Sequence, residues 1–451
     1  MKVTGALLLT LSAVTPASSV FVIIPGIIQQ AGTGALIAMA AAALVALAMA
    51  FVYAELASAF PLAGGEYAML GRALGPAAGF VFMGMNTVGS TLAPAVLALG
   101  ASAYVTALWP GAQSVPVAIG IVTAATAFGI LNIRVNAWVT GLFLLIEVLA
   151  LLALAVLGFS HMHRGIAALF QHPVVLSGGA LAAAPISLIG LATAVGVFSY
   201  NGFGSAVYFS EEMHEAPRRV ARTILWALAL TVAFEFIPLT AVLLGAPDLK
   251  ALLGTQSPFS DFVQASGGRG LSVAVGLGVA LSIVNAVIAI VLINARFFYS
   301  SGRDRVWHGA INEALVQVHG RFDSPWVATL LAGATGIATC FVPFNLLLVL
   351  NGTGVVVMYL LLCLGVLVGR ATGRTAHAAY RMPLFPLAPI IGLAALVYIL
   401  YANWIDPVVG RPSLIADVVM LVLAGLYYAL LRRRRGSDWV MTGPAEEPSE
   451  G

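Results

Sequence analysis

Residues 198–205 read FSYNGFGS, and they interrupt an apolar run that is otherwise long enough to cross a membrane. The stretch places two glycines and several polar side chains at a depth where a transmembrane helix is normally continuous. A comparable interruption lies in the first apolar run, where residues 16–19 read PASS. Proline removes a backbone donor from the middle of a helix, and the small residues that follow leave room around the gap. The two stretches therefore predict two membrane helices that break near their middle.

The composition indicates an integral membrane protein. Of 451 residues, 61% are hydrophobic and 9% are charged, and the mean hydropathy is +1.01, whereas a soluble domain is about one quarter charged. The apolar stretches show no strict alternation, which favours helices over barrel strands. Since about 20 apolar residues span the hydrocarbon, the chain is expected to be an all-α polytopic protein of about twelve transmembrane helices. The predicted helices cover residues 4–30, 34–54, 75–108, 115–131, 136–159, 185–211, 221–244, 271–299, 326–341, 346–368, 384–404 and 416–431.

The basic residues predict the orientation of these helices. Lys and Arg concentrate in the short loops on the cytoplasmic side of a membrane protein. With the N-terminus inside, 17 of the 21 basic residues fall in inner segments, and the outer loops hold only Arg164, Lys250, Arg269 and Arg411. We therefore expect both termini to be cytoplasmic. Compact loops and the lack of eukaryotic targeting signals favour a bacterial cytoplasmic membrane.

Several classes of function find no support in the sequence. The only lysines are Lys2 and Lys250, and neither follows the glycine-rich loop that binds a nucleotide phosphate. The seven histidines do not form the HExxH motif of zinc enzymes, and Cys340 and Cys363 have neither metal-ligand nor redox spacing. The basic residues are dispersed, so nucleic acid is not an expected partner. We expect no enzyme activity, no metal and no cofactor.

The N-terminal segment has a second interpretation. Lys2, the apolar run over residues 5–14 and the small residues after Pro16 are also compatible with a cleaved signal peptide. The apolar run resumes over residues 20–28. That continuation favours one membrane helix with a break inside it.

The paired breaks predict a solute-binding site. Broken helices in corresponding positions of two groups of five helices are typical of inverted-repeat transporters, whose sites lie near the membrane midplane. The half-helix after a break begins with free N–H groups that suit a carboxylate, and the half-helix before it ends in carbonyls that suit an ammonium group. A zwitterionic solute is thus held by backbone groups alone.

Three groups of residues, in order along most of the chain, form a family pattern. The first comprises Ala54, Glu55, Leu56, Pro61, Gly64, Gly65, Tyr67, Gly75, Pro76 and Gly79. The second runs from Phe198 to Glu212 and continues with Pro217, Arg218, Arg219 and Arg222. The third comprises Ala295, Arg296, Tyr299, Arg303, Asp304, Ser324 and Pro325. In these motifs the chain resembles the amino acid-polyamine-organocation (APC) superfamily of permeases.

The resemblance implies a LeuT-type fold with a 5+5 inverted repeat in which helices 1 and 6 are broken. Residues 1–160 form the first repeat, residues 180–370 the second and residues 380–432 two further helices, and residues 433–451 are expected to be a disordered cytosolic tail. Ala17, Ser18 and Ser19 match the break that receives the substrate carboxylate, Phe198 matches an aromatic gate, and Asn86 faces the cavity from helix 3. The full set of implied substrate-binding residues is Ala17, Ser18, Ser19, Val20, Asn86, Phe198, Ser199, Asn201, Gly202 and Phe203.

The chain departs from the family pattern at several positions. Ala17 and Ser19 replace the usual glycines, Gly204 stands where many relatives carry an acid, and Glu147 stands where many carry a lysine. A charge at membrane depth is costly and usually functional, so Glu147 and Glu235 are the predicted coupling residues, and Glu147 is predicted either to carry the coupling proton or to bind the ammonium group of the substrate. An alternative is a structural carboxyl that is neutral or hydrogen-bonded between helices.

Other polar residues have local interpretations. Glu55, Glu211 and Glu212 lie near predicted cytoplasmic helix ends, where we expect ion pairs with nearby arginines. Ser282 and Asn285 border either an ion site or a set of interhelical hydrogen bonds.

The sequence thus predicts a secondary transporter for amino acids or related small organic amines, working by alternating access and driven by protons or by exchange. A polyamine or amino-alcohol permease is the alternative, and a channel or receptor is a more distant one. The sequence leaves open whether the protein is a monomer or a homodimer.

Overall fold

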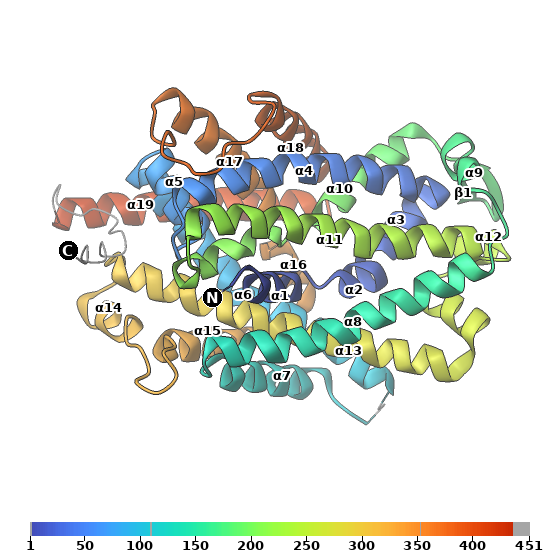
Figure 1. Cartoon of the computed structure of the whole chain (residues 1–451), viewed down its shortest axis with the longest axis horizontal. Helices are drawn as coiled ribbons and strands as arrows, with labels where there is room; N and C mark the ends of the chain where they lie inside the picture. The colour runs from blue at the N-terminus through green and yellow to red at the C-terminus, as the bar shows by residue number, and fades with distance from the viewer. Residues whose placement is uncertain (1, 109–110, 352, 436–451) are drawn as a thin grey trace.

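The computed structural model describes residues 2–108, 111–351 and 353–435 as a helical bundle (Figure 1). The first part of the chain contains α1 (Val3–Val14), α2 (Pro16–Ser18), the π-helix η1 (Ser19–Ile23), α3 (Ile24–Ala31), the 3-10 turn η2 (Gly32–Gly34), α4 (Ala35–Ala59), α5 (Glu66–Ala73), α6 (Pro76–Leu108), α7 (Ser114–Gly129) and α8 (Ile133–Ser160). The middle part contains α9 (Ile166–Gln171), β1 (Val174–Ser177), β2 (Ala180–Ala183), α10 (Ile186–Ser199), the 3-10 helix η3 (Phe203–Glu212), α11 (Ala216–Gly245), α12 (Leu249–Gly254) and α13 (Pro258–Arg303). The last part contains α14 (Gly309–Leu315), α15 (Trp326–Thr339), α16 (Phe344–Asn351), α17 (Gly354–Ala371), α18 (Leu387–Ile405) and α19 (Gly410–Arg435).

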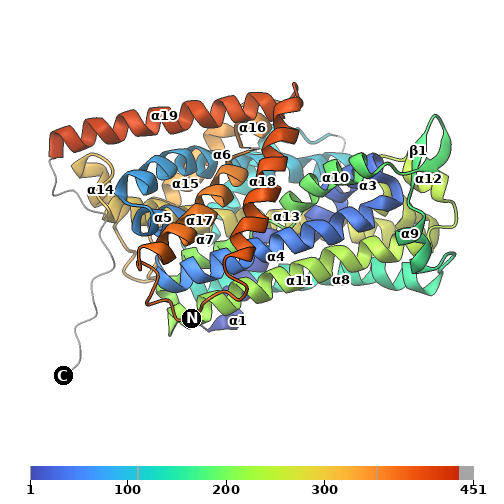
Figure 2. The ribbon, with the colours of Figure 1, turned by 90° about the horizontal axis from the view of Figure 1, so that it is seen from above.

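Most of the long helices, among them α4, α8 and α11, run along one axis of the molecule, and α18 crosses that axis steeply in Figure 2. Figures 1 and 2 place α5 and α14 at one end, called here the α5 end, and α9, α12 and β1 at the other, called the hairpin end. Helix α1 packs against α8, α11, α13 and η3, so the N-terminal segment lies inside the bundle. Figure 1 shows α1 and α2 end to end, with their junction near the middle of the long axis.

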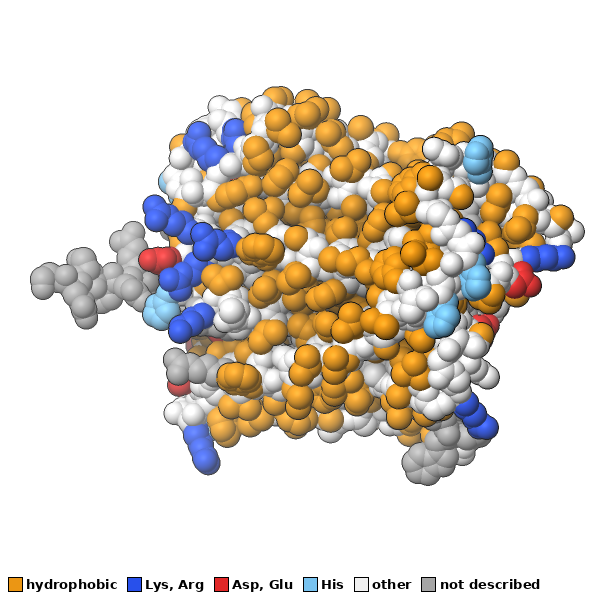
Figure 3. Space-filling model, turned by 45° about the vertical axis from the view of Figure 1, so that its right-hand side comes forward, with side chains coloured by type: hydrophobic (Ala, Val, Ile, Leu, Met, Phe, Trp, Pro, Cys, Tyr) orange, Lys and Arg blue, Asp and Glu red, His pale blue; other side chains and the backbone are white. Residues whose placement is uncertain are grey.

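The outer surface of the bundle suits lipid. One face of α8 exposes large apolar side chains at helical spacing, namely Leu142, Leu145, Leu149, Leu152 and Val156, each more than half exposed. Helix α19 exposes a similar row. In Figure 3, Lys and Arg gather at the two ends of the visible face, and the area between them is hydrophobic. This pattern is that of a protein whose middle is surrounded by hydrocarbon.

The helices correspond to the predicted segments. Among the described residues, nine runs are long and apolar enough to span a membrane, and two shorter apolar helices are α7 and α15. The first run, residues 3–59, joins the predicted helices 4–30 and 34–54. A helical polytopic membrane fold is therefore confirmed, and the number of membrane crossings stays a prediction.

Some elements differ from the sequence expectation. A short antiparallel hairpin pairs Val174 with Ala183, in a segment where no strand was expected, and it lies beside η2. Helix α19 continues to Arg435, so the start of the predicted disordered tail at residue 433 is wrong for residues 433–435. The rest of that predicted tail, residues 436–451, lies outside the described residues.

Candidate functional site

The first interruption separates α1 from α2. Helix α1 ends at Val14, and Thr15 adopts a left-handed conformation with φ 48° and ψ 71° while its N–H bonds to Leu11 O at 2.9 Å. This conformation is unusual for a β-branched residue. Pro16 then starts α2, where its missing N–H costs nothing. The π-helical turn η1 follows at once, so a longer α-helical segment resumes only at Ile24.

A carboxylate of the protein itself occupies the start of α2. The N–H of Ala17 donates to Oε1 of Glu147 at 2.7 Å, and the Thr15 hydroxyl lies 3.4 Å from the same oxygen. Glu147 is fully buried, on the face of α8 opposite its lipid-facing row. A negative group at an exposed backbone N–H is electrostatically favourable. The amide predicted to receive a substrate carboxylate is therefore hydrogen-bonded to Glu147 in this structure.

The second interruption separates α10 from η3. Helix α10 ends at Ser199, and Gly202 has φ 113°, which L side chains rarely adopt. A Cβ atom at Gly202 would lie 3.0 Å from Cγ2 of Val14, the last residue of α1. Only glycine meets both the conformation and the close approach. The two interruptions are thus in contact with each other.

A chain of hydrogen bonds also joins the two interruptions. The Ser19 hydroxyl donates to the carbonyl of Ser199 at 3.2 Å, and the Ser199 hydroxyl donates to Oε2 of Glu235 at 2.6 Å. Glu235 is fully buried and comes from α11. Each interruption therefore has one buried carboxylate from a neighbouring intact helix.

Helix α13 covers the same region. Asn285 donates to the hydroxyl of Ser12 at 2.9 Å and to the carbonyl of Thr140 at 3.2 Å, while Thr15 Oγ1 lies 3.5 Å from the carbonyl of Ser282. These contacts join α13 to α1 and α8. The interpretation of Asn285 as an interhelical hydrogen-bonding residue is confirmed, and an ion site here stays a prediction.

A further buried carboxylate, Glu66, lies in a cluster with Tyr53, Tyr208 and Asn86. Glu66, at the start of α5, accepts hydrogen bonds from the hydroxyls of Tyr53 and Tyr208. Asn86 on α6 donates to the Tyr208 hydroxyl at 3.1 Å. The sequence reading missed Glu66, although an acid directly after Gly64 and Gly65 was visible. A Cβ at Gly65 would lie 2.4 Å from Tyr208, so the glycine lets the tyrosine approach.

Aromatic rings connect this cluster to the second interruption. The Tyr359 hydroxyl donates to Oδ1 of Asn201 at 2.7 Å, and the Tyr359 ring stacks on Phe203 with centroids 6.3 Å apart. Tyr53 meets both rings edge-on. A Cβ at Gly204 would lie 2.4 Å from Tyr53, which is why an acid is not accommodated at this position.

Comparison with known proteins identifies the architecture. A family model described as amino acid permease matches residues 2–429. The chain belongs to the amino acid permease family. It is thereby a member of the APC superfamily and a permease.

The relatives of this permease are transporters. An uncharacterized transporter of Mycobacterium tuberculosis is 28% identical over 93% of this chain and 89% of the relative. The branched-chain amino acid permease BcaP of Bacillus subtilis is 24% identical over 90% of this chain and 87% of the relative. A methylthioribose transporter of the same species is 23% identical over 91% and 89%.

The predicted site residues of the permease fall into three groups. Ala17, Ser19, Val20, Ser199 and Phe203 are buried at the two interruptions. The half-buried residues are Ser18, Asn86, Asn201 and Gly202. Asn86 is hydrogen-bonded to Tyr208, and Asn201 to Tyr359. The side chain of Phe198 is 46% exposed, unlike that of Ser199 beside it, and its gate role stays a prediction.

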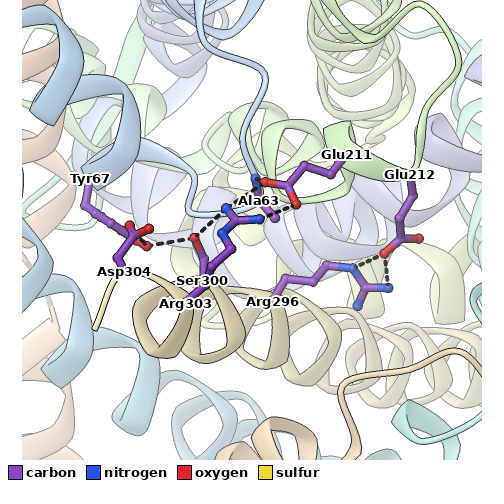
Figure 4. A network of polar contacts seen from close by, with 8 residues as sticks. All are labelled: Ala63, Tyr67, Glu211, Glu212, Arg296, Ser300, Arg303 and Asp304. Carbon is purple, nitrogen blue, oxygen red and sulfur yellow. Dashed lines mark hydrogen bonds and ion pairs between the residues drawn. The ribbon is translucent and has the colours of Figure 1, made fainter. Parts of the chain in front are cut away.

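An ion-pair network closes the α5 end of the permease (Figure 4). Arg303 donates to both oxygens of Glu211 at 2.8 and 2.9 Å, and Glu211 also accepts the N–H of Ala63 at 2.8 Å. Arg296 pairs with Glu212 at 2.8 Å. These contacts join η3 to α13 and to the segment before α5, and they confirm the predicted ion pairs of Glu211 and Glu212.

Two further contacts hold the same end together. The Tyr67 hydroxyl on α5 donates to Asp304 at 2.9 Å and is hydrogen-bonded to the hydroxyl of Ser300 at 2.7 Å (Figure 4). On the other side of the bundle, Glu55 on α4 pairs with Arg370 on α17. The α5 end of the permease is thus tied by polar contacts, while the interruptions lie deeper in the bundle.

Proposed function

We propose that this permease is a secondary active transporter for amino acids or related small organic amines. In this proposal, residues 1–160 and 180–370 are inverted repeats that rock around the two interruptions, and transport is coupled to protons or to exchange. The observation that carries the proposal is the pair of buried carboxylates, Glu147 and Glu235, hydrogen-bonded to the two interruptions that contact each other.

Burial supports a coupling role for these acids. Both side chains are 0% exposed, and among the described residues neither forms an ion pair. An ionised carboxylate without a partner inside a protein costs several kcal/mol. Each acid therefore favours either a bound proton or a bound cation. A group that exchanges the two is suited to couple proton movement to solute movement.

The ion pairs at the α5 end support alternating access. Arg303–Glu211 and Arg296–Glu212 lie between η3, which follows the second interruption, and α13. Separation of η3 from α13 would open a path from that end to the interruptions. The arginines Arg432, Arg433 and Arg434 follow the apolar part of α19. They support a cytoplasmic location of the α5 end and of both termini in a bacterial inner membrane.

The relatives guide the choice of solutes. One is named as a branched-chain amino acid permease and another as a methylthioribose transporter, so the family fold serves chemically different solutes. The proposal therefore covers two classes of solute, amino acids and small organic amines. Lipid is its solvent, and we propose no cofactor.

Uptake by proteoliposomes tests the proposal. The purified full chain is reconstituted, and a panel of labelled amino acids and amines is offered with and without an inward proton gradient. We expect saturable uptake or counterflow of at least one member of the panel. If the whole panel shows neither, while the protein is folded and inserted, the transporter proposal is wrong.

A further inference from the structure

We propose that the central site selects a solute that carries an ammonium group and lacks a carboxylate, such as an amino alcohol or a polyamine. This inference rests on the proposed transport function and narrows its substrate class. The positive charge of the solute would lie between Glu147 and Glu235.

The position that a substrate carboxylate would need is already occupied in the protein. At the first interruption, the N–H of Ala17 already donates to Glu147 at 2.7 Å. Helix α2 continues through η1 into α3, and the anion at the N-terminus of this helical run is Glu147 of the protein itself. A solute carboxylate at Ala17 would also lie beside the Glu147 carboxylate, and two like charges at such a distance repel each other.

Two buried hydrogen-bond acceptors at the interruptions have no donor among the described residues. Oε2 of Glu147 and Oε1 of Glu235 are buried and have no hydrogen-bond partner within the described part of the chain. The other oxygen of each carboxylate is bonded at an interruption, to Ala17 and to Ser199 respectively. Buried carboxylate oxygens are almost always hydrogen-bonded. An ammonium group has three N–H donors and one positive charge. It can therefore donate a hydrogen bond to each of these two oxygens and neutralise negative charge at the same time.

The cations of the described ion pairs lie away from the interruptions. At the α5 end, Arg370, Arg303 and Arg296 pair with Glu55, Glu211 and Glu212. In the part of the chain that the structure describes, no ion pair reaches Glu147 or Glu235. The negative charge at the interruptions is thus left for a proton or a solute.

Protons and the solute therefore compete. The titratable groups that face Glu235 are Glu147 from α8 and Tyr200 from the end of α10, and the other neighbours are the hydroxyls of Ser19 and Ser199. Glu147 faces Thr15, Ala17 and Glu235. Since a bound ammonium favours the ionised carboxylates, solute binding releases protons, and acidification weakens it.

Matched pairs of solutes test the inference. Ethanolamine and serine differ only by a carboxylate, as do putrescine and ornithine. Binding to the purified full chain is measured by isothermal titration calorimetry at pH 5.5 and pH 8. We expect at least one amine to bind tenfold more tightly than its amino acid, and to bind more weakly at pH 5.5. Tighter binding of both amino acids, or no binding by either amine at pH 8, would overturn the inference.

Variants separate a direct role from a structural one. Glu147→Gln and Glu235→Gln keep the size of the side chain and remove its charge, and each is expected to weaken amine binding about tenfold and to reduce its pH dependence. Glu313→Gln, on the exposed surface of α14, is the control and should bind like the wild type. Size-exclusion chromatography shows whether each variant is folded, and if one central variant is not, the other still tests the inference. A folded variant that binds the amine with wild-type affinity contradicts the inference.

Uptake measurements distinguish a failure of this inference from a failure of the transporter proposal. Uptake of amino acids without uptake of amines would defeat this inference and leave the transporter proposal intact. The lack of uptake for either class would defeat both.

Discussion

Arg370 on α17 donates two hydrogen bonds of 2.6 Å, from Nε and from one terminal nitrogen, to the two carboxylate oxygens of Glu55 on α4. Glu55 is 0% exposed and also accepts the N–H of Met382 at 2.8 Å. The guanidinium lies over the ring of Phe385, 4.1 Å from its centroid. A buried acid with this set of donors links α4, α17 and the loop before α18.

Loss of Arg370 is expected to destabilise the fold. In Arg370→Ala, the Glu55 carboxylate stays buried and loses its cation, which costs about 3–5 kcal/mol in comparable pairs. Unfolding of the purified protein by a denaturing detergent measures the free-energy change. Arg321→Ala, in an exposed loop, is the control. Equal stability of Arg370→Ala and the wild type would show that the Arg370–Glu55 pair does not contribute to the stability of the fold.

Gly202→Ala is expected to damage transport. The φ of 113° is strained for alanine, and its Cβ would lie 3.0 Å from Val14, so we expect a cost of about 1–3 kcal/mol and an uptake rate reduced at least tenfold. Gly26→Ala is the matched control, because Gly26 lies in α3 with no atom within 4 Å of an added Cβ. Transport activity of both variants in proteoliposomes, together with their melting temperatures, decides. A fully active Gly202→Ala would mean that the interruptions tolerate separation.

Glu147→Gln is expected to separate exchange from accumulation. The amide oxygen of glutamine still accepts the Ala17 N–H, whereas the side chain no longer binds or releases a proton. Uptake driven by a proton gradient should disappear, and solute exchange at equal pH should remain measurable. Flux assays over a range of pH check this. A variant whose uptake keeps the pH dependence of the wild type removes Glu147 from coupling.

Asp406, in the loop between α18 and α19, gives a prediction about acid stability. The N–H groups of Val408 and Gly410 donate to its carboxylate at 2.9 Å, and these bonds hold the pKa of Asp406 below its ordinary value. The stabilising contribution is present above the pKa of the unfolded chain, about 3.9, and is lost as the pH falls through the lower folded value. Asp406→Asn should therefore melt earlier than the wild type at pH 7, and the difference should shrink below about pH 4. A difference that is constant with pH would contradict this account.

The positions of the two interruptions could be predicted from the sequence because the residues responsible act on the backbone at their own position. Pro16 and Gly202 disturb a helix wherever they occur in one, and an acid such as Glu147 in an apolar run must be buried for the run to face lipid. The partner of that acid was not predictable, since Ala17 lies 130 positions away in the chain. Glu66 was not predicted as a site residue, because acids are common between two helices and the sequence does not show that this one is buried.

Other features depend on packing and left no local signal. The side chain of Phe198 is half exposed while that of Phe203 is buried, and the sequence does not say how a helix is rotated just before it breaks. The π-helical turn η1 and the hairpin β1–β2 arise in the same way from neighbouring elements. The charge pattern did predict ion pairs. Glu55, Glu211 and Glu212 pair with arginines at the end of the bundle where the basic residues are dense.

The winding of η3 has a mechanical consequence. A 3-10 helix rises about 2.0 Å per residue and an α-helix about 1.5 Å, so the ten residues of η3 are about 5 Å longer than the same residues in α-helical form. Glu211 and Glu212 lie at the far end of that extended segment, where the arginines of α13 hold them. Rewinding to an α-helix would retract both carboxylates by this length and release the arginines without any tilt of the intact helices.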